Sequence, residues 1–320
     1  MCLSHRWGKS VSLTTETTTL KEGKGILWSE LPGTFQDALT VTCRLGIQYL
    51  WIDSLCILQD SVEDWEKEAS KMASVYQGSF LTLAASKSAG SNEGYFAVSV
   101  PENKTLNFSR NTGDSKPYSI HVRKLLPLWI HLNAHFRKFP LLSRGWVYQE
   151  RLLSPRVLHF GSQGLIWECI EQTRCECIGT HECGILSHPK MDHGEVVRSG
   201  QNVENLAWRW RQMVMEYTSL KLTRVTDLLP ALAGIVEEMQ AFRDGKYLVG
   251  LWEDTLVSDL CWSTWDYYAH NITETAQRLS HRGTISSAWR APTWSWASTE
   301  ATIEYSDLNE SERASEGIGS

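Results

Sequence analysis

Long hydrophobic runs are absent from this sequence. Across its 320 residues no stretch approaches the roughly 18 consecutive apolar residues that a membrane-spanning helix needs. Residues 1–8 also lack the basic and then apolar layout of a secretory signal. We therefore expect a cytoplasmic protein without a membrane partner, in which the 8 cysteines are mostly reduced thiols.

An excess of basic residues is missing as well. The chain has 31 Lys and Arg against 37 Asp and Glu, which gives a net charge of −6. Nucleic acids and anionic membranes favour partners with a basic surface. We therefore expect no nucleic-acid partner.

Three motifs that mark large enzyme classes do not occur. The sequence has no Walker-type phosphate loop, no Gly-x-Gly-x-x-Gly and no Gly-x-Ser-x-Gly. These absences remove most of the support for ATP-driven enzymes, for dinucleotide-dependent dehydrogenases and for α/β-hydrolases.

Regularly spaced zinc ligands are also lacking. The candidates lie in one region: Cys169, Cys175, Cys177, His181, Cys183 and His188. Structural zinc sites favour closely spaced cysteine pairs, whereas here Cys-x-Cys is followed by irregular gaps. We expect no metal site and no bound cofactor. A catalytic Cys–His pair stays open, although Cys56 lies in an apolar run, where thiols are usually inert.

The composition is that of a globular protein. Apolar residues make up 42% and charged residues 21% of a chain long enough for one large domain or two ordinary ones. The 15 tryptophans are unusually many, and we interpret most of them as large rings that fill a core.

Residues 1–86 alternate strand and helix patterns. Thr34-x-x-Asp37 and Ser61-x-x-Asp64 resemble helix starts. Short apolar runs at 47–52 and 80–85 are typical of buried parallel strands. Leu3-Ser4 would end a first strand, apparently truncated at the N-terminus. The alternation predicts the α/β class, with a doubly wound parallel sheet and flanking helices.

The rest of the chain is expected to extend this core. In chain order we predict a surface connection at 87–118, a helical segment at 125–139, a hairpin of 157–160 and 165–168, helices at 203–217 and 227–239, and a Trp-rich segment at 291–298. The expected domains are a core at 1–170, a polar loop at 171–200, an α+β C-terminal extension at 201–300 packed on the core, and a disordered tail at 301–320.

Polar side chains follow the ends of the predicted parallel strands. Residues 4–8, Asp53-Ser54 and Ser86-Lys87 leave three of these ends. Ligands of open parallel sheets bind outside the carboxyl ends of the strands. We therefore expect these segments to form a site for a small ligand that carries a sugar or phosphate.

Two carboxylates near this edge have alternative interpretations. Asp53 either orients a ligand hydroxyl or a basic neighbour, or caps the following turn. Glu68 shares a helix face with Trp65 and Met72, where a carboxylate can have a raised pKa and act in catalysis. The charged run around Glu68 favours instead a solvated flank position. Residues 144–150 either close over a ligand or buttress the sheet.

Three ordered blocks resemble the fungal heterokaryon-incompatibility (HET) family. The first block is Ser4-His-Arg-Trp-Gly8. The second runs from Tyr49-Leu-Trp-Ile-Asp53 through Gln59-Asp60 to Ala85. The third is Arg144-Gly-Trp146 with Gln149-Glu150. Together the blocks are specific, whereas each alone is a weak signal.

The resemblance implies a role in self/non-self recognition, in which fusion of genetically different hyphae triggers cell death. Other incompatibility proteins and self-association are the implied partners. The family is remotely similar to TIR domains, which implies a flavodoxin/TIR-like sheet and an NAD-like small molecule as ligand or substrate. Some TIR domains hydrolyse NAD with a Glu in a Trp-x-x-x-Glu context, which Trp65-Glu-Lys-Glu68 resembles with one residue fewer.

On this resemblance, Glu68 and Asp53 are the expected catalytic residues. Glu68 would stabilise an oxocarbenium-like centre, and Asp53 would position the ribose. The expected ligand-binding residues are Ser4, His5, Arg6, Trp7, Gly8, Trp65, Arg144 and Trp146. Two alternatives stay open: a non-catalytic signalling module that acts by self-association, and an inactive truncated paralogue.

Overall fold

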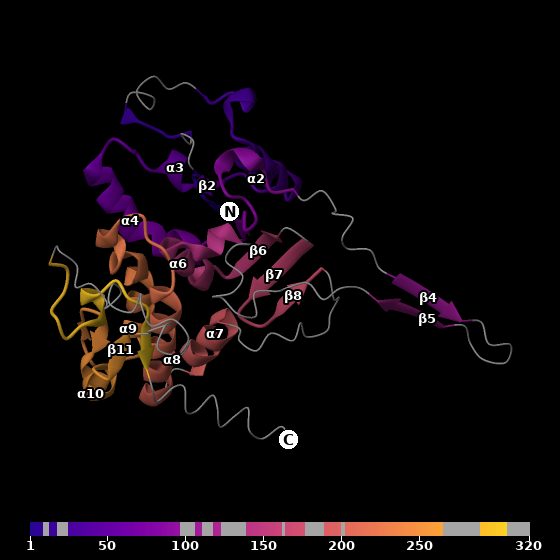
Figure 1. The fold of residues 1–320 in the computed structure, drawn as a ribbon. Helices are drawn as coiled ribbons and strands as arrows, with labels where there is room; N and C mark the ends of the chain where they lie inside the picture. Colours follow the sequence, from indigo (N-terminus) through magenta and orange to yellow (C-terminus); the bar gives the residue numbers. More distant parts are fainter. Residues whose placement is uncertain are drawn as a thin grey trace, which may run out of the picture.

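A six-stranded sheet forms the centre of the fold (Figure 1). The computed structural model describes residues 1–8, 13–17, 25–96, 106–110, 118–122, 139–161, 164–176, 189–199, 202–264 and 289–305. The strands of the central sheet are β1 (Cys2–Ser4), β2 (Trp51–Ile52), β3 (Thr82–Ala84), β6 (Arg156–Gly161), β7 (Gly164–Cys169) and β8 (Thr173–Cys175). Their order is β2-β1-β3-β6-β7-β8; the first four are parallel, and β7 and β8 continue antiparallel. The expected α/β class and mostly parallel central sheet are confirmed.

The strand order reverses at β1. After β1 the chain forms β2 at one edge and then crosses to β3 on the other side of β1. Ligands of open parallel sheets bind outside the carboxyl ends of strands near such a reversal. The segments that follow β1, β2 and β3 are therefore where a site is expected.

Helices α2 (Gly33–Arg44) and α4 (Val62–Gln77) cover opposite faces of the sheet. Leu3 packs with Phe35 of α2, whereas the adjacent Cys2 packs with Met72 and Tyr76 of α4. Neighbouring strand residues point to opposite faces, so each of these two contacts belongs to a different face. The short helix α3 (Asp53–Cys56) follows β2 directly.

The two expected helix starts differ in outcome. The Ser61 side chain accepts a hydrogen bond from the Asp64 backbone N–H at 3.2 Å and caps α4 as predicted. Helix α2 begins earlier than expected, and Thr34 lies buried in its first turn. Asp37 accepts a hydrogen bond from the backbone N–H of Tyr95 at 2.7 Å, so it fastens a loop to the helix.

Several segments differ from their predicted structure. Residues 145–153, for which no helix was predicted, form α6 (Gly145–Leu153). The connection at 87–118 contains β4 (Leu106–Arg110), which pairs with β5 (Tyr118–Val122). The prediction of a polar loop at 171–200 was wrong, because β8 and α7 (Pro189–Ser199) lie within this range. Strand β12 (Ile303–Tyr305) lies in the expected tail. The helical segment predicted at 125–139 falls almost entirely outside the described residues.

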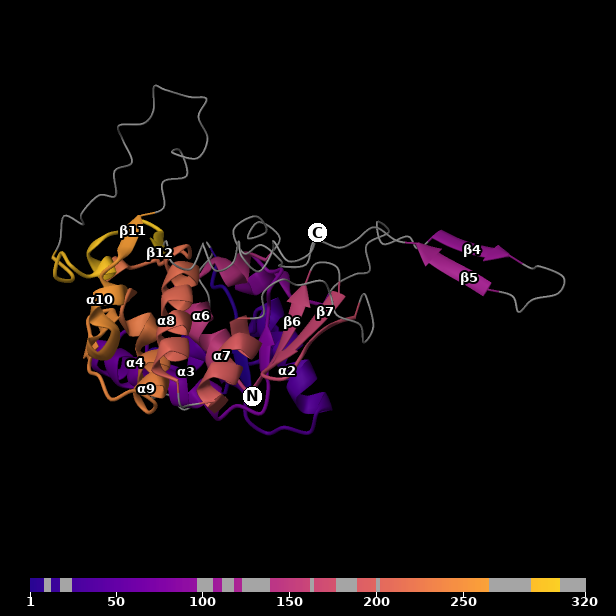
Figure 2. The ribbon, with the colours of Figure 1, turned by 90° about the horizontal axis from the view of Figure 1, so that it is seen from below.

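The C-terminal part of the chain adds helices and small sheets beside α4 and α6 (Figure 2). Its elements are α8 (Val203–Thr218), α9 (Ala233–Gln240), α10 (Leu256–Asp259), β9 (Tyr247–Leu248) paired with β10 (Leu251–Trp252), and β11 (Trp262–Thr264) paired with β12. The helix predicted at 203–217 is confirmed. The helix predicted at 227–239 is shorter than expected. Two 3-10 turns, Val225–Asp227 and Pro230–Leu232, precede α9.

Tryptophans form the core of this C-terminal part. The indole N–H groups of Trp210 and Trp296, both fully buried, donate to the same Gly250 carbonyl at 2.9 and 2.8 Å. Gly250 has a φ of 101°, and a Cβ there would lie 2.7 Å from the Trp296 indole nitrogen. The close approach of this carbonyl therefore requires glycine. The interpretation of these rings as core residues is confirmed.

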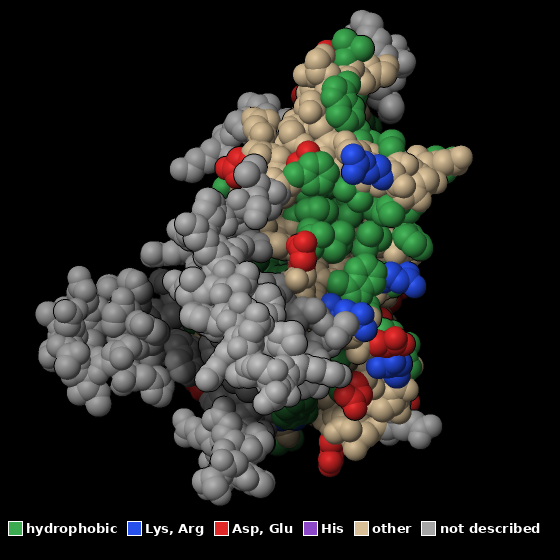
Figure 3. All heavy atoms as spheres, turned by 90° about the vertical axis from the view of Figure 1, so that its right-hand side faces the viewer, with side chains coloured by type: hydrophobic (Ala, Val, Ile, Leu, Met, Phe, Trp, Pro, Cys, Tyr) green, Lys and Arg blue, Asp and Glu red, His purple; other side chains and the backbone are tan. Residues whose placement is uncertain are grey.

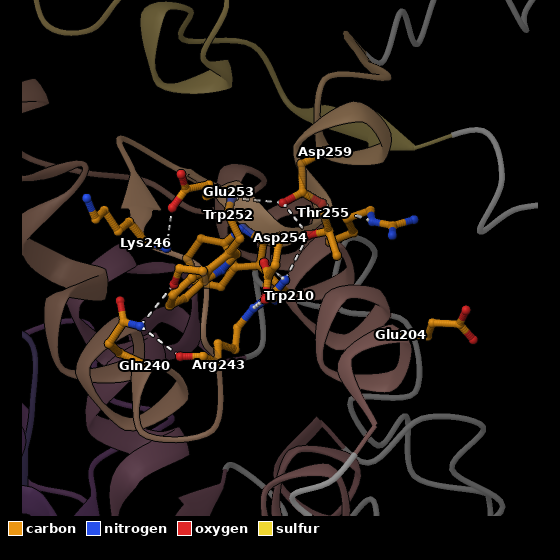
Figure 4. A network of polar contacts seen from close by, with 12 residues as sticks. Glu204, Trp210, Gln240, Arg243, Lys246, Trp252, Glu253, Asp254, Thr255 and Asp259 are labelled. Atoms are coloured by element: carbon orange, nitrogen blue, oxygen red, sulfur yellow. Dashed lines mark hydrogen bonds and ion pairs between the residues drawn. The ribbon is translucent and has the colours of Figure 1, made fainter.

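A buried arginine links the turns around the core (Figure 4). The guanidinium of Arg243 donates to both carboxylate oxygens of Asp254, at 3.1 and 2.6 Å, and to Thr255 at 2.7 Å. Its plane lies over the Trp252 ring, 4.6 Å from the ring centroid. Asp259 accepts the Trp252 backbone N–H at 3.0 Å. These bonds satisfy buried groups, namely the Trp252 backbone N–H and two nitrogens of the Arg243 guanidinium.

The C-terminal part shares its core with α4 and α6. The buried cluster that contains Trp210 and Trp296 also includes Ala73 of α4 and Tyr148 of α6. The Gly234 backbone N–H, in α9, donates to the Gln149 side chain of α6 at 2.8 Å. Because these contacts are buried, the two halves of the chain stabilise each other.

A network of buried charges lies between α6, the sheet and α7. Arg151 donates to Glu168 through two nitrogens, at 2.8 and 2.7 Å. His159 lies between Glu168, at 3.2 Å, and the Ser86 hydroxyl, at 3.0 Å. The buried Lys190 of α7 donates to the Arg151 carbonyl near the end of α6, at 2.6 Å. Burial lowers the pKa of Lys190 to about 8.

Within the described ranges, no helix is long and apolar enough to cross a membrane. Among the described residues visible on the face that lies to the right in Figure 1, hydrophobic side chains gather in one patch, and Lys and Arg side chains are scattered among Asp and Glu (Figure 3).

Candidate functional site

A cavity of about 420 Å³ lies beside the carboxyl ends of β1 and β2. This volume falls in the range of small-molecule sites, roughly 300–1,000 Å³. The cavity is lined by Trp7, Asp53, Ile57, Gln59, Asp60, Ser61, Val62, Trp65, Met72, Arg144, Trp146, Glu150, Thr223, Arg224 and Asp227. Side chains from the turns after both strands, from α4, from α6 and from the C-terminal part therefore meet at one place.

Trp7 and Asp53 bring together the ends of β1 and β2. The Trp7 indole N–H donates to Asp53 Oδ2 at 3.0 Å, and Asp53 Oδ1 accepts the Ser54 backbone N–H at 2.7 Å. The strand pairing Leu3↔Ile52 places the two turns side by side. Asp53 therefore bonds the turn that follows it, as one of its two predicted roles requires, and it also lines the cavity. Its predicted role toward a ligand stays a prediction.

His5 packs beside Asp53. Its Nδ1 lies 3.5 Å from Asp53 Oδ1, and its ring packs edge-on against Phe35 with 5.0 Å between the ring centroids. Burial lowers the pKa of His5, so the imidazole is neutral at neutral pH. The Arg144 guanidinium donates to the His5 carbonyl at 2.8 Å and holds the segment after β1 in place.

Glu150 is, like Asp227, a buried carboxyl group of the cavity lining. It lies in α6, where no other side chain facing the cavity is acidic. Burial is the main reason why the pKa of Glu150 is raised to about 7, and the charge of Asp53 adds to the increase. The nearby hydroxyls of Ser4 and Tyr76 and the charge of Arg144 act in the opposite direction. Glu150 can therefore take up or release a proton near neutral pH.

The C-terminal part completes the lining of the cavity. The Trp146 indole N–H donates to Asp227 Oδ2 at 2.9 Å. The preceding segment is held by backbone bonds, from the Gly145 N–H to the Lys221 carbonyl at 2.9 Å and from the Lys221 N–H to the Ser143 carbonyl at 2.8 Å. Glycine at 145 allows a close approach of Leu222, because a Cβ would lie 2.5 Å from a Leu222 methyl group. Thr223, Arg224 and Asp227 thus reach a cavity formed mainly by residues before 151.

Half of the expected ligand-binding residues line this cavity. Trp7, Trp65, Arg144 and Trp146 do, together with the expected catalytic Asp53. Ser4 and His5 are buried behind the lining, and the exposed Arg6 and Gly8 are not part of it. A Cβ on Gly8 would lie 2.8 Å from the Gly90 Cα, so Gly8 allows two loops to touch.

Glu68 lies at the margin of the site. Its carboxylate is ion-paired with Lys71 at 2.7 Å and does not line the cavity. Desolvation is the main cause that raises the pKa of the Cys56 thiol, and the charges of Asp53 and Glu68 add to it. Glu68 is therefore near Cys56 of α3. The role expected for Glu68 stays a prediction.

The segment after β3 does not join the cavity. Ser86 is fully buried and bonds to His159, as described above. The expectation that three strand ends share one site is therefore correct for two of them. Ser86, His159 and Glu168 form a hydrogen-bonded row, but each is buried, so the row supports the sheet.

Metal-ligating groups do not cluster in the part of the chain that the structure describes. Cys2, Cys43, Cys56, Cys169 and Cys261 are free, and Cys175 is disulfide-bonded. Four of the six zinc candidates, Cys177, His181, Cys183 and His188, lie outside the described residues.

Sequence reasoning missed four charged residues of the cavity: Asp60, Glu150, Arg224 and Asp227. Glu150 was quoted only as part of a motif, although its place among apolar neighbours in α6 was a signal for a perturbed carboxyl group. Arg224 and Asp227 lie in a segment without any local motif. Only the packing of the C-terminal part on α6 brings them to the site.

Comparisons with known proteins agree with the arrangement of the blocks along the chain. Residues 1–150 match the family model described as Heterokaryon incompatibility protein (HET). No curated protein and no solved structure matches the chain. The match indicates a function related to heterokaryon incompatibility. The cavity is formed mostly by residues of this match, from the turn after β1 to Glu150 in α6, and we conclude that residues 1–150 are a HET domain.

Proposed function

We propose that this protein acts in fungal self/non-self recognition by cleaving the bond between nicotinamide and ribose in NAD. The observation that carries the proposal is the position of Glu150, a buried carboxyl group with a pKa of about 7, in a cavity that Asp53 also lines. Cleavage of a glycosidic bond needs a carboxylate near the anomeric carbon and a shielded pocket.

In the proposed reaction the bond between C1′ of the ribose and the ring nitrogen breaks. The electron pair of the bond goes to the nitrogen, and nicotinamide leaves as a neutral molecule. Ionised Glu150 stabilises the positive charge that develops at C1′ and accepts a proton from the attacking water. The products are nicotinamide, ADP-ribose and one proton, so atoms and charges balance.

The other lining residues have positioning roles in this proposal. Asp53 is fixed by Trp7 and Ser54 and would accept a hydrogen bond from a ribose hydroxyl. The exposed Arg224 lines the cavity from the C-terminal part and would contact a phosphate. Glu68, the carboxylate expected from the TIR resemblance, is the competing candidate for the role of Glu150.

The test is to follow nicotinamide release from NAD by chromatography, with the full chain at high concentration. We expect release by the unchanged protein and a loss of at least a hundredfold with Glu150→Gln. Glu195→Gln is the matched control, because Glu195 is an exposed residue of α7 far from the lining. A loss with Glu68→Gln that equals the loss with Glu150→Gln would assign the catalytic role to Glu68 instead.

The outcome also distinguishes catalysis from signalling by association. If no variant and no condition gives nicotinamide release, while expression of the chain still kills fungal cells, the hydrolysis proposal is wrong. The HET domain would then act as a non-catalytic module.

A further inference from the structure

Carboxylates without cationic partners surround the cavity. Asp53, Glu150 and Asp227 all line it, and none of them is ion-paired with a Lys or Arg in the described part of the chain. Asp53 bonds to uncharged donors, the Trp7 indole and the Ser54 backbone, and its neighbour His5 is neutral. Two cations, Arg144 and Arg224, line the same cavity, against the four carboxyl groups of Asp53, Asp60, Glu150 and Asp227. The carboxyl groups outnumber the cations, so net negative charge is left for a ligand to balance.

Three tryptophans, Trp7, Trp65 and Trp146, line the same cavity, and we refer to them as the tryptophan cage. Trp65 and Trp146 are perpendicular, at 88°, with 6.5 Å between the ring centroids. The indole N–H groups of Trp7 and Trp146 are bonded to Asp53 and Asp227. These bonds fix the rings by their edges. A ring face carries negative charge density and attracts cations, most strongly in Trp.

We propose that the tryptophan cage and the unpaired carboxylates bind a ligand with a positively charged ring nitrogen, and so select oxidised nicotinamide against neutral rings. The identity of the ligand as a nicotinamide rests on the proposed function, whereas preference for the cation rests only on the geometry of the cavity. The pyridinium of NAD carries this charge, and the reduced form does not. A pocket of this kind holds the substrate and releases the neutral nicotinamide that cleavage produces.

Binding of a cation should also move a proton. Glu150 has a pKa of about 7, so it is about half protonated at pH 7. A positive charge in the cavity favours the ionised form. Binding at pH 7 should therefore release up to about half a proton for each ligand, which the neutral ring should not do.

The test compares 1-methylnicotinamide, a cation, with nicotinamide, which is neutral. Neither has a ribose bond, so their binding is independent of cleavage. We expect titration calorimetry to show at least tenfold tighter binding of the cation at pH 7. Titration in buffers with different ionisation enthalpies should show proton release for the cation only, and this release should disappear in Glu150→Gln.

Substitutions test whether the preference for the cation depends on the tryptophan cage and the carboxylates. Trp65→Leu and Asp53→Asn should each weaken binding of the cation at least fivefold. Trp289→Leu and Asp244→Asn are the matched controls, because both residues are exposed and neither lines the cavity, and they should leave binding unchanged. Equal affinity for cation and neutral ring would overturn the inference even if NAD is cleaved. Tight binding of the cation without NAD cleavage would support the cage and reject the hydrolysis.

Discussion

The indole N–H of Trp146 donates to Asp227 Oδ2 at 2.9 Å, and this bond joins the HET domain to residues outside the family match. Both partners line the cavity. The bond therefore links the stability of the joint with the shape of the site. Its loss should affect both properties.

Asp227→Ala should lower the free energy of unfolding by about 1–3 kcal/mol, because it leaves the half-buried Trp146 N–H without its charged acceptor. Urea denaturation followed by tryptophan fluorescence measures this difference. Asp244→Ala, at an exposed position nearby in the chain, should change it little. Equal stability of the two variants would mean that the Trp146–Asp227 bond contributes nothing to the joint.

Glu150 should make the protein less stable as pH rises toward neutrality. Its pKa is raised from 4.5 to about 7 in the folded state, so the folded state holds a proton that the unfolded state has lost between these values. Stability from this group is fully present below pH 4.5 and is lost through pH 7, by about 3 kcal/mol in total. In Glu150→Gln this decline should be absent. Denaturant titrations at pH 5 and pH 8, which lie at about the two ends of this pH range, measure the decline in stability. An unchanged decline in the variant would refute the assignment of the raised pKa to Glu150.

Gly234→Ala should disrupt the packing of α9 on α4. The added Cβ would overlap the Ala73 Cβ and lie 2.9 Å from the Gln149 side-chain oxygen. Overpacking of this kind lowers stability by about 1–3 kcal/mol. Gly25→Ala is the control, because nothing lies within 4 Å of the Cβ it would add. Thermal unfolding should show a lower midpoint for the first variant only.

Glu168→Gln should lower stability by about 3 kcal/mol at pH 7, because it leaves the Arg151 guanidinium without its buried counter-charge. Burial alone would raise the pKa of Glu168, but Arg151 and His159 hold it well below its usual range. The contribution is thus present above pH 4.5 and lost as pH falls further. The difference between the unchanged protein and the variant should shrink below that pH. Glu171→Gln, on the exposed turn nearby, should behave like the unchanged protein.

Elements with one polar and one apolar face were predictable from the sequence. Helix α4 begins after the capping Ser61 as predicted, and Met72, which was placed on one face of this helix, is buried. Helix α6 was not predicted because most of its side chains are buried, including those of Gln149 and Glu150. Its sequence therefore has no polar face that recurs with the helical period. Helix α7 was missed for a related reason, since it buries the polar Lys190 and His193.

The site was predictable only as far as local rules reach. Trp7 and Asp53 follow paired parallel strands, so the strand order brings them together. Arg224 and Asp227 reach the cavity through the packing of distant helices, which no local pattern indicates. Glu150 lines the cavity and Glu68 does not, and this difference likewise depends on which helix faces turn toward the cavity, which no local pattern indicates.

The carbonyl of Gly250, which accepts both Trp210 and Trp296, has a consequence for the synthesis of the protein. A ribosome completes the HET domain long before it reaches Trp296. Until then the emerging chain has no partner for the second indole, and the helices that carry Asp227 to the cavity lack part of their core. The core that supports Asp227 at the cavity is therefore complete only after translation has passed residue 296.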